Sequence, residues 1–296
     1  MITVSPTTRI QVRNILLATD FSSSSEAALP HALSLARRYD AHLVVAHVIR
    51  PDLFELVPTE QSDVLKESTR RHAEEQMTRL LVSGRLRGIP HQVLIEEGTL
   101  WSVLSREIKS HDIDLVVVGT HGRTGSRKLL LGSVAEEVFR LAPCPVLTVG
   151  PRVAAGKGPL DSPKKVLYAT DFRAESERAA AFAVSLAQEH QAHLSLLHVV
   201  KDAVDASSVN HTMLQEFFLR RLKDLVPSDA ELWCDPEFLV EFGDPAETIL
   251  RAAQQHDTEL VVLGIRRSAT FAGHLPPATA YKVVCQAQCP VLTVRG

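Results

Sequence analysis

The sequence predicts an α/β fold with two repeated, Rossmann-like domains, each a five-stranded, mainly parallel sheet flanked by helices. Three observations predict this fold. The 296-residue chain contains one internal repeat. Within each copy, short apolar runs alternate with longer segments of helical character. Aromatic residues make up only 5% of the chain, and the abundant Ala, Val and Leu suit parallel strands that helices cover on both faces.

The repeat is clearest near the start of each copy. Residues 14–49 align with residues 165–200 without a gap, and 17 of the 36 positions are identical, which is too many for chance. Six residues are then missing from the second copy, so that Gly98 matches Gly243. Each copy has the size of one ordinary domain.

The repeat sets the expected domain boundaries. Residues 150–163 are rich in Gly and Pro, which is typical of a linker. We therefore expect a first domain at 1–150, a linker at 151–163 and a second domain at 164–296.

Strands and helices alternate through the first copy. The predicted strands are 15–19, 42–49, 91–97, 114–120 and 145–149. The predicted helices begin near Ser23 and cover about 60–84, 99–110 and 133–141. Ser23 and Glu26 have capping-box spacing, and Pro30 is expected to kink the first helix. Ligands of such sheets bind beyond the carboxyl ends of the strands.

A set of glycines follows the fourth predicted strand. Gly119, Gly122 and the pair Gly132-Ser133 form the pattern G-x2-G-x9-G-S. Gly119 lets a ligand approach the backbone, Gly122 permits a tight turn, and Gly132 with Ser133 opens a helix whose free N–H groups favour a phosphate. Single glycines of this kind are often only turn residues, but the whole set favours a phosphate site. It is neither a P-loop nor a GxGxxG motif.

Charged side chains accompany these glycines. Arg123, Arg127 and Lys128 lie in the intervening loop, where they can screen phosphate charge. Asp20 follows the first strand and has two open interpretations: a ligand for a ribose hydroxyl, a base edge or a magnesium-bound water, or a cap of the next helix. His47 is interpreted as a structural or edge-of-site histidine.

These motifs together resemble the universal stress protein family. The opening ATDFS, the HV that ends the second strand, the glycine pattern and the terminal PVLTV carry the resemblance, which spans nearly the whole chain as a tandem. It implies an adenine nucleotide α-hydrolase-like fold. By position it implies that adenosine contacts Ala18, Thr19, Asp20, Val48, Val118 and Gly119, and that phosphates contact Gly122, Gly132, Ser133, Val134 and Ala135.

The second copy departs from this pattern. Gly122 becomes Arg267, and Gly132 becomes Pro277, which follows Pro276. Proline has no backbone N–H, so two possible phosphate donors are missing. The expectation is a retained fold with a damaged phosphate site.

The first hypothesis for function is an ATP-binding stress-response protein with one competent site. It would act as a nucleotide-dependent switch or a slow ATPase without dedicated catalysis, and Mg²⁺ would bridge the phosphates. A nucleotide-independent scaffold is one alternative. An adenylate-forming enzyme of the wider superfamily is another, although its SGGxDS and HxGH-type motifs are absent from the sequence.

Composition limits the partners. A net charge of −3 argues against a general nucleic-acid binder, and no apolar run reaches the 18 or more residues that span a membrane. Four scattered cysteines favour a reduced, cytoplasmic protein. The resemblance implies a homodimer, with strands 145–149 and 290–294 pairing within one chain. A further protein partner is expected but not identified.

Overall fold

The computed structural model describes residues 10–51, 58–120, 131–153, 158–201, 211–226, 236–265 and 278–295. The chain divides into two compact units. The N-terminal unit comprises Gln11–Val149 with Pro159–Asp161, and the C-terminal unit comprises Met1–Ile10, Gly150–Gly158 and Ser162–Gly296. No helix within the described ranges is long and apolar enough to span a membrane.

The N-terminal unit contains a five-stranded sheet whose neighbouring strands are all parallel. Its strands are β1 (Asn14–Ala18), β2 (His42–Ile49), β3 (His91–Glu97), β4 (Leu115–Gly119) and β5 (Val146–Val149). Their order across the sheet is β3-β2-β1-β4-β5. The chain therefore reverses direction across the sheet between β1 and β4, and their carboxyl ends form a ligand crevice in folds of this kind. The predicted α/β class is confirmed.

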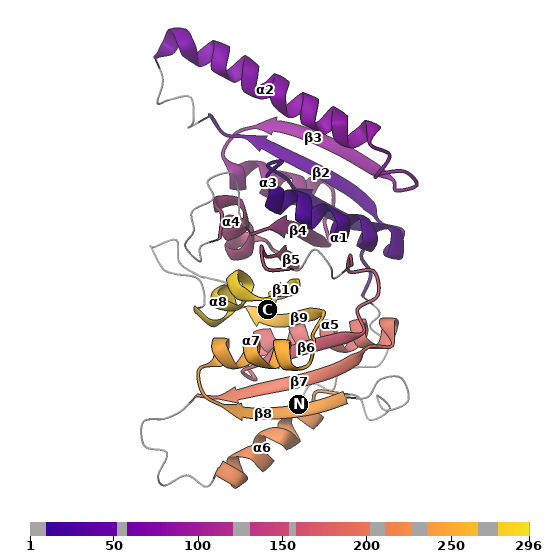
Figure 1. The fold of residues 1–296 in the computed structure, drawn as a ribbon, viewed down its shortest axis with the longest axis vertical. Coiled ribbons are helices and arrows are strands. Elements are labelled where there is room, and N and C mark those ends of the chain that lie inside the picture. The colour runs from indigo at the N-terminus through magenta and orange to yellow at the C-terminus, as the bar shows by residue number, and fades with distance from the viewer. Residues whose placement is uncertain are drawn as a thin grey trace. The chain divides into compact units, whose positions relative to one another are not determined.

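Within the described residues of this unit, four helices cover the sheet. They are α1 (Ser23–Tyr39), α2 (Thr59–Val82), α3 (Leu100–Ser110) and α4 (Ser133–Leu141). Right-handed crossovers place α1 and α2 on one face and α3 and α4 on the other. Accordingly, α2 lies along β2 and β3, while α3 and α4 contact each other (Figure 1).

The central strands form the core of the unit. Ile15, Leu16 and Leu17 of β1 are almost completely buried, as are Val116 and Val117 of β4. Burial of consecutive residues means that both faces of these strands are covered, as their continuous apolar sequence predicts.

The start of α1 differs by one residue from the predicted cap. Ser22, not Ser23, is the N-cap, and its hydroxyl oxygen accepts a hydrogen bond from the backbone N of Ser25 at 3.3 Å. The cap predicted from the spacing was therefore wrong, because the position of the cap depends on the conformation of the turn before the helix. Pro30 lies inside the helix, which continues to Tyr39.

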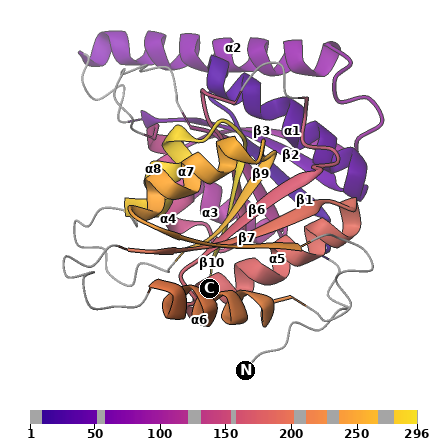
Figure 2. The same cartoon turned by 60° about the horizontal axis from the view of Figure 1, so that its bottom comes forward.

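The C-terminal unit repeats the architecture. Its strands are β6 (Lys165–Thr170), β7 (His193–Val200), β8 (Pro236–Phe242), β9 (Leu260–Ile265) and β10 (Val291–Arg295), in the parallel order β10-β9-β6-β7-β8. Its helices are α5 (Ala174–His190), α6 (His211–Lys223), α7 (Pro245–Gln255) and α8 (Ala278–Gln286). Figure 2 shows α5 and α6 on one side of these strands and α7 and α8 on the other.

In the second copy, the sequence Asp244-Pro245 followed by Glu247 predicts a helix start, and the structure confirms it. Asp244 is the N-cap of α7, Pro245 occupies the first helical position, and the Asp244 carboxylate accepts a hydrogen bond from the backbone N of Glu247 at 3.0 Å. The local sequence is sufficient here because all three residues favour the same boundary.

A short piece of the predicted linker packs into the N-terminal unit. The backbone N–H of Leu160 donates to Nδ1 of His31 on α1 at 3.1 Å, and both residues are buried. Burial lowers the pKa of His31 because it disfavours the imidazolium form. The neutral ring is the form that can accept this hydrogen bond.

Candidate functional site

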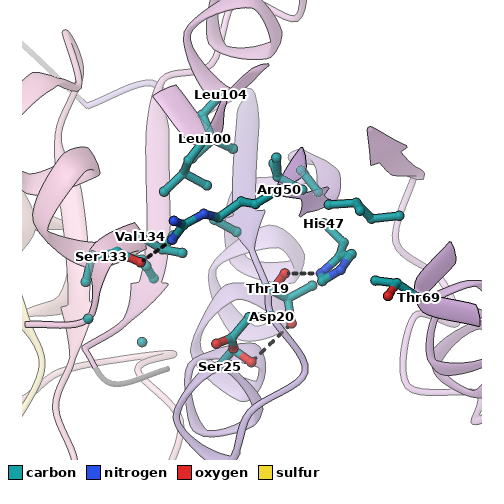
Figure 3. Close-up of a pocket in the computed structure, with 18 residues that line it drawn as sticks. Thr19, Asp20, Ser25, His47, Arg50, Thr69, Leu100, Leu104, Ser133 and Val134 are labelled. Atoms are coloured by element: carbon teal, nitrogen blue, oxygen red, sulfur yellow. Dashed lines mark hydrogen bonds between the residues drawn. The ribbon is translucent and has the colours of Figure 1, made fainter. Parts of the chain in front are cut away.

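A cavity of about 220 Å³ opens at the carboxyl ends of β1, β2 and β4 in the N-terminal unit. Figure 3 shows the side chains that line it, which come from both faces of the sheet. The lining residues are Ala18, Thr19, Asp20, Ser25, Ala46, His47, Val48, Ile49, Arg50, Thr69, Leu100, Leu104, Val118, Gly119, Gly132, Ser133, Val134 and Ala135.

The sequence prediction and this lining agree closely. Every predicted nucleotide-binding residue that the structure describes lines the cavity. Gly122 and Arg123 lie outside the described residues, as do Arg127 and Lys128. The topology explains the convergence, because β1, β2 and β4 are adjacent and end at the same edge.

One part of the cavity is apolar. Leu100 and Leu104 extend from α3 toward it, and Val48 and Val118 contribute from the ends of β2 and β4. Apolar walls of this kind suit a flat ring system with few charges. Leu100 and Leu104 were not identified as site residues from the sequence, because their spacing only indicates a helix face that packs on the sheet.

A tight turn after β1 orients Asp20. The hydroxyl of Thr19 accepts a hydrogen bond from the backbone N of Phe21 at 3.1 Å, and the Asp20 carboxylate accepts one from the backbone N of Ser22 at 3.0 Å. Phe21 has a φ of 59°, a strained value for an aromatic residue. Asp20 is therefore not the cap of α1; it shapes the turn before the cap, beside the cavity.

His47 supports the same turn. Its Nδ1 lies 2.8 Å from the carbonyl oxygen of Thr19, which can only accept, so Nδ1 carries the proton and donates (Figure 3). Its ring lies 4.7 Å from that of Phe21. His198 repeats the arrangement with Thr170 in the C-terminal unit, also at 2.8 Å. The histidine thus has a positioning role and also lines the cavity.

Gly119 is required for a reason that the sequence did not reveal. A β-carbon at this position would lie 2.5 Å from the carbonyl carbon of Ser24 and 2.8 Å from the backbone N of Ser25. The close neighbour in this direction is the first turn of α1, not a ligand. The missing side chain allows α1 to begin against the end of β4 and brings the turn with Asp20 to the cavity.

The start of α4 forms the polar end of the cavity. Gly132 is the N-cap and has no side-chain cap hydrogen bond, and its own backbone N–H donates to the carbonyl oxygen of Thr120 at 2.6 Å. The prediction that the Gly132 N–H is available to a phosphate is therefore wrong. The orphan N–H groups of the first turn belong instead to Ser133, Val134 and Ala135.

Ser133 is the first residue of α4 rather than its cap. Ser133 and Glu136 have the spacing of a capping box, but the motif is not used, because the helix starts one residue earlier than it requires. The hydroxyl instead accepts a hydrogen bond from Nη1 of Arg50 at 3.4 Å (Figure 3). Arg50 follows β2, and its place in the site could not be predicted because its partner is 83 residues away.

The described residues contain no group of three His, Cys, Asp or Glu side chains that could hold a metal ion. Asp20 is the carboxylate that lines the cavity. A metal at this site would therefore need most of its ligands from water or from a bound anion, which is the usual mode for Mg²⁺ with phosphates.

The corresponding region of the C-terminal unit contains an aromatic cluster. Phe172 and His198 match Phe21 and His47 in the repeat, and Phe218 of α6 packs on both, with ring centroids 5.8 and 4.2 Å away. Burial lowers the pKa of His198. In the N-terminal unit, Phe21 instead packs against a cluster that contains Ala73 of α2. The Pro276-Pro277 segment lies outside the described residues.

Comparisons with known proteins agree with this arrangement. The universal stress protein family model matches residues 11–150 and 163–295. A universal stress protein of Mycolicibacterium smegmatis is 30% identical over 291 residues, covering 95% of this chain and 96% of the relative. One from Methanocaldococcus jannaschii is 31% identical over 138 residues, covering 46% of this chain and 81% of the relative.

A solved structure covers the whole architecture. The crystal structure of a universal stress protein from Archaeoglobus fulgidus matches with a TM-score of 0.69 and 19% identity, covering 97% of this chain and 99% of that one. At this identity the match concerns the fold alone. It extends the agreement in topology to both units.

Proposed function

Because the chain belongs to the universal stress protein family, we propose that its N-terminal unit binds ATP and acts as a nucleotide-dependent switch or slow ATPase in a stress response. One observation carries the proposal. The same cavity combines apolar walls from α3 and the sheet with the open N-terminus of α4. An adenine nucleotide has the matching parts: a flat ring system at one end and anionic phosphates at the other.

The adenosine part fits the apolar side of the cavity. Leu100 and Leu104 provide one wall, and the backbone of Val48 at the end of β2 provides groups that can bond the edge of the base. The Asp20 carboxylate is oriented by its turn and can accept hydrogen bonds from ribose hydroxyls. Asp20 thereby favours a ribonucleotide over a free phosphate.

The phosphate part fits the start of α4. The N–H groups of Ser133, Val134 and Ala135 carry the positive end of the helix dipole, and the Ser133 hydroxyl adds a donor. Gly122 and Arg123 remain proposed phosphate ligands on the strength of the family pattern. The hydrogen bond from the Gly132 N–H to the carbonyl oxygen of Thr120 keeps the end of β4 beside the start of α4.

Mg²⁺ fits this site only together with the nucleotide. Asp20 supplies one carboxylate, and Mg²⁺ is commonly held by one or two carboxylates, phosphate oxygens and water. Bound Mg²⁺ would neutralise phosphate charge. In the absence of nucleotide, the described residues offer too few ligands to retain it.

A pair of substitutions at Ser133 tests the proposal. Ser133→Ala removes the hydroxyl, and Ser133→Pro removes both the hydroxyl and one backbone N–H at a helical position where proline is tolerated. We expect ATP affinity, measured by isothermal titration calorimetry with Mg²⁺ present, to fall stepwise from wild type to Ala to Pro. Ser102→Ala in α3, which does not line the cavity, is the control.

The outcome separates the proposal from its rival. Circular dichroism should show that all variants retain the helix content of the wild type. Failure of folded wild-type protein to bind ATP, ADP or AMP would instead favour a nucleotide-independent scaffold. Equal ATP affinities for the wild type, Ser133→Ala and Ser133→Pro would mean that the phosphates bind somewhere other than the start of α4.

A further inference from the structure

Arg50 is positioned to contact a ligand that binds between β2 and α4. It directly follows β2, lines the cavity, and directs its guanidinium across the cavity toward the first residue of α4 (Figure 3). Its Nη1 donates to the hydroxyl of Ser133 at 3.4 Å. This hydrogen bond is long and its acceptor is a neutral hydroxyl, so this contact itself is weak.

A carboxylate on α4 interacts electrostatically with Arg50. Glu137 lies one helical turn after Ser133, and the positive charge of Arg50 acts to lower its pKa. Burial is the larger effect and raises the pKa of Glu137 overall. The backbone of Trp101, in the first turn of α3, also acts to lower the pKa of Glu137.

The C-terminal unit carries different side chains at these positions. In the repeat register, Lys201, Ala278 and Lys282 replace Arg50, Ser133 and Glu137. Lys282 pairs with Glu247 at 2.9 Å and lies 3.5 Å from Asp244, the residue that caps α7. The second copy thus stabilises its helix start with its own aspartate and has no arginine–serine contact at this position.

We propose that Arg50 is a specificity-determining residue that binds the β- or γ-phosphate of the nucleotide and selects di- and triphosphates over AMP and adenosine. This inference rests on the proposed function of the same cavity. Without nucleotide, the guanidinium lies on Ser133 and near Glu137. With a polyphosphate at the start of α4, it exchanges the neutral hydroxyl for phosphate oxygens, to which arginine donates two parallel hydrogen bonds.

The exchange is favourable for two physical reasons. A charge-assisted hydrogen bond to phosphate is stronger than one to a neutral hydroxyl. The move also releases the Ser133 hydroxyl, which can then donate to the same phosphates. Arg50 approaches from the β2 side and α4 from the other, so a polyphosphate between them is held from both sides, whereas adenosine lacks the group that Arg50 binds.

Calorimetric titration of the full chain with ATP and, separately, with adenosine tests the inference. For Arg50→Gln we expect ATP affinity to fall by about tenfold or more, as for loss of a hydrogen bond between charged groups. Adenosine affinity should change by less than about twofold, because no phosphate is present. Arg140→Gln is the matched control: it removes a cation from α4 that pairs with Glu136 at 3.7 Å and does not line the cavity.

Two further variants make the result specific. Arg50→Lys retains the charge but not the planar pair of donors, and should give an intermediate ATP affinity. Glu137→Gln removes the negative charge that attracts Arg50 and keeps the shape of the side chain, so ATP affinity should rise. A fall in ATP affinity for Glu137→Gln would contradict the exchange of partners.

Failure of this inference differs from failure of the proposed function. Wild-type protein that binds no nucleotide would overturn both. Wild-type protein that binds ATP while Arg50→Gln binds it equally well would overturn only the role of Arg50. Equal losses of ATP and adenosine affinity in Arg50→Gln would show that Arg50 supports the cavity without selecting for phosphates.

Discussion

The first turn of α1 at Ser24 lies directly against the position where Gly119, at the end of β4, would carry a side chain. A β-carbon there would clash with the Ser24 carbonyl group, at 2.5 Å from its carbon. This contact joins the two segments that form the centre of the cavity, the turn after β1 and the end of β4. The glycine that begins the nucleotide motif therefore has a packing role before any ligand binds.

Gly119→Ala should destabilise the N-terminal unit. The new methyl group meets backbone atoms, which cannot rotate away, and overpacking of this kind typically costs about 1–3 kcal/mol. Thermal unfolding followed by circular dichroism should show a lower midpoint. Gly158→Ala is the control, because no atom lies within 4 Å of the added carbon. An unchanged midpoint for Gly119→Ala would show that α1 can shift at no cost.

The cap of α7 should make stability depend on pH. The hydrogen bond from the backbone of Glu247 lowers the pKa of Asp244 below its ordinary value of 3.8. A lowered pKa in the folded state contributes stability that is present above pH 3.8 and is lost as the pH falls through the lowered value. Urea unfolding at pH 7 should therefore give a free energy of unfolding that is about 1 kcal/mol higher for the wild type than for Asp244→Ala, the usual effect of an N-cap.

The companion variant Asp244→Asn separates charge from hydrogen bonding. Asn still accepts the cap hydrogen bond, so Asp244→Asn should lower the free energy of unfolding at pH 7 by less than Asp244→Ala does. The difference between Asp244→Asn and the wild type should vanish at a pH below the lowered pKa of Asp244, where the wild-type carboxyl also loses its charge. Asp257→Asn serves as the control, since its side chain is 79% exposed and forms no cap. A gap between Asp244→Asn and wild type that is the same at both pH values would contradict the role of the charge.

The hydrogen bond between Leu160 and His31 should break in acid. Burial lowers the pKa of His31, so the neutral ring and its contribution to stability persist above the ordinary value of 6.5 and are lost as the pH falls through the lowered pKa. Hydrogen exchange should show a protection factor for the Leu160 amide that is high at pH 7 and collapses at low pH. The amide of Asp161, bonded to the carbonyl of Pro159 at 2.9 Å, provides an internal control. Parallel behaviour of the two amides would argue against His31 as the cause.

Much of the fold could be predicted because its signals are local. Continuous apolar strands such as 114–120 and the agreement of two copies located the elements to within about two residues, and Asp244-Pro245 marked a helix start that the structure confirms. The exceptions are the caps of α1 and α4, where a serine one position away had equally good spacing. Cap choice depends on the path of the preceding turn, which spacing does not contain.

In the candidate site, too, local signals could be predicted from the sequence and contacts between distant segments could not. Residues at strand ends, such as Asp20 and Val48, were predicted because parallel topology brings those ends together. Arg50 and Leu104 were missed because their roles depend on contacts between distant segments. The hydrogen bond from the Gly132 N–H to the carbonyl oxygen of Thr120 was missed for the same reason, because the motif gives the spacing of the glycines but not their contacts.

The most direct test of the account is the stoichiometry of ATP binding to the full chain, measured by titration calorimetry in the presence of Mg²⁺. We predict one ATP per chain, held at the N-terminal unit, because the second copy has Ala278 in place of Ser133 and Pro277 in place of Gly132. It therefore lacks the Ser133 hydroxyl and the N–H with which Gly132 bonds the carbonyl oxygen of Thr120. Two ATP per chain would contradict the single-site account, and no binding at all would refute the nucleotide-dependent function.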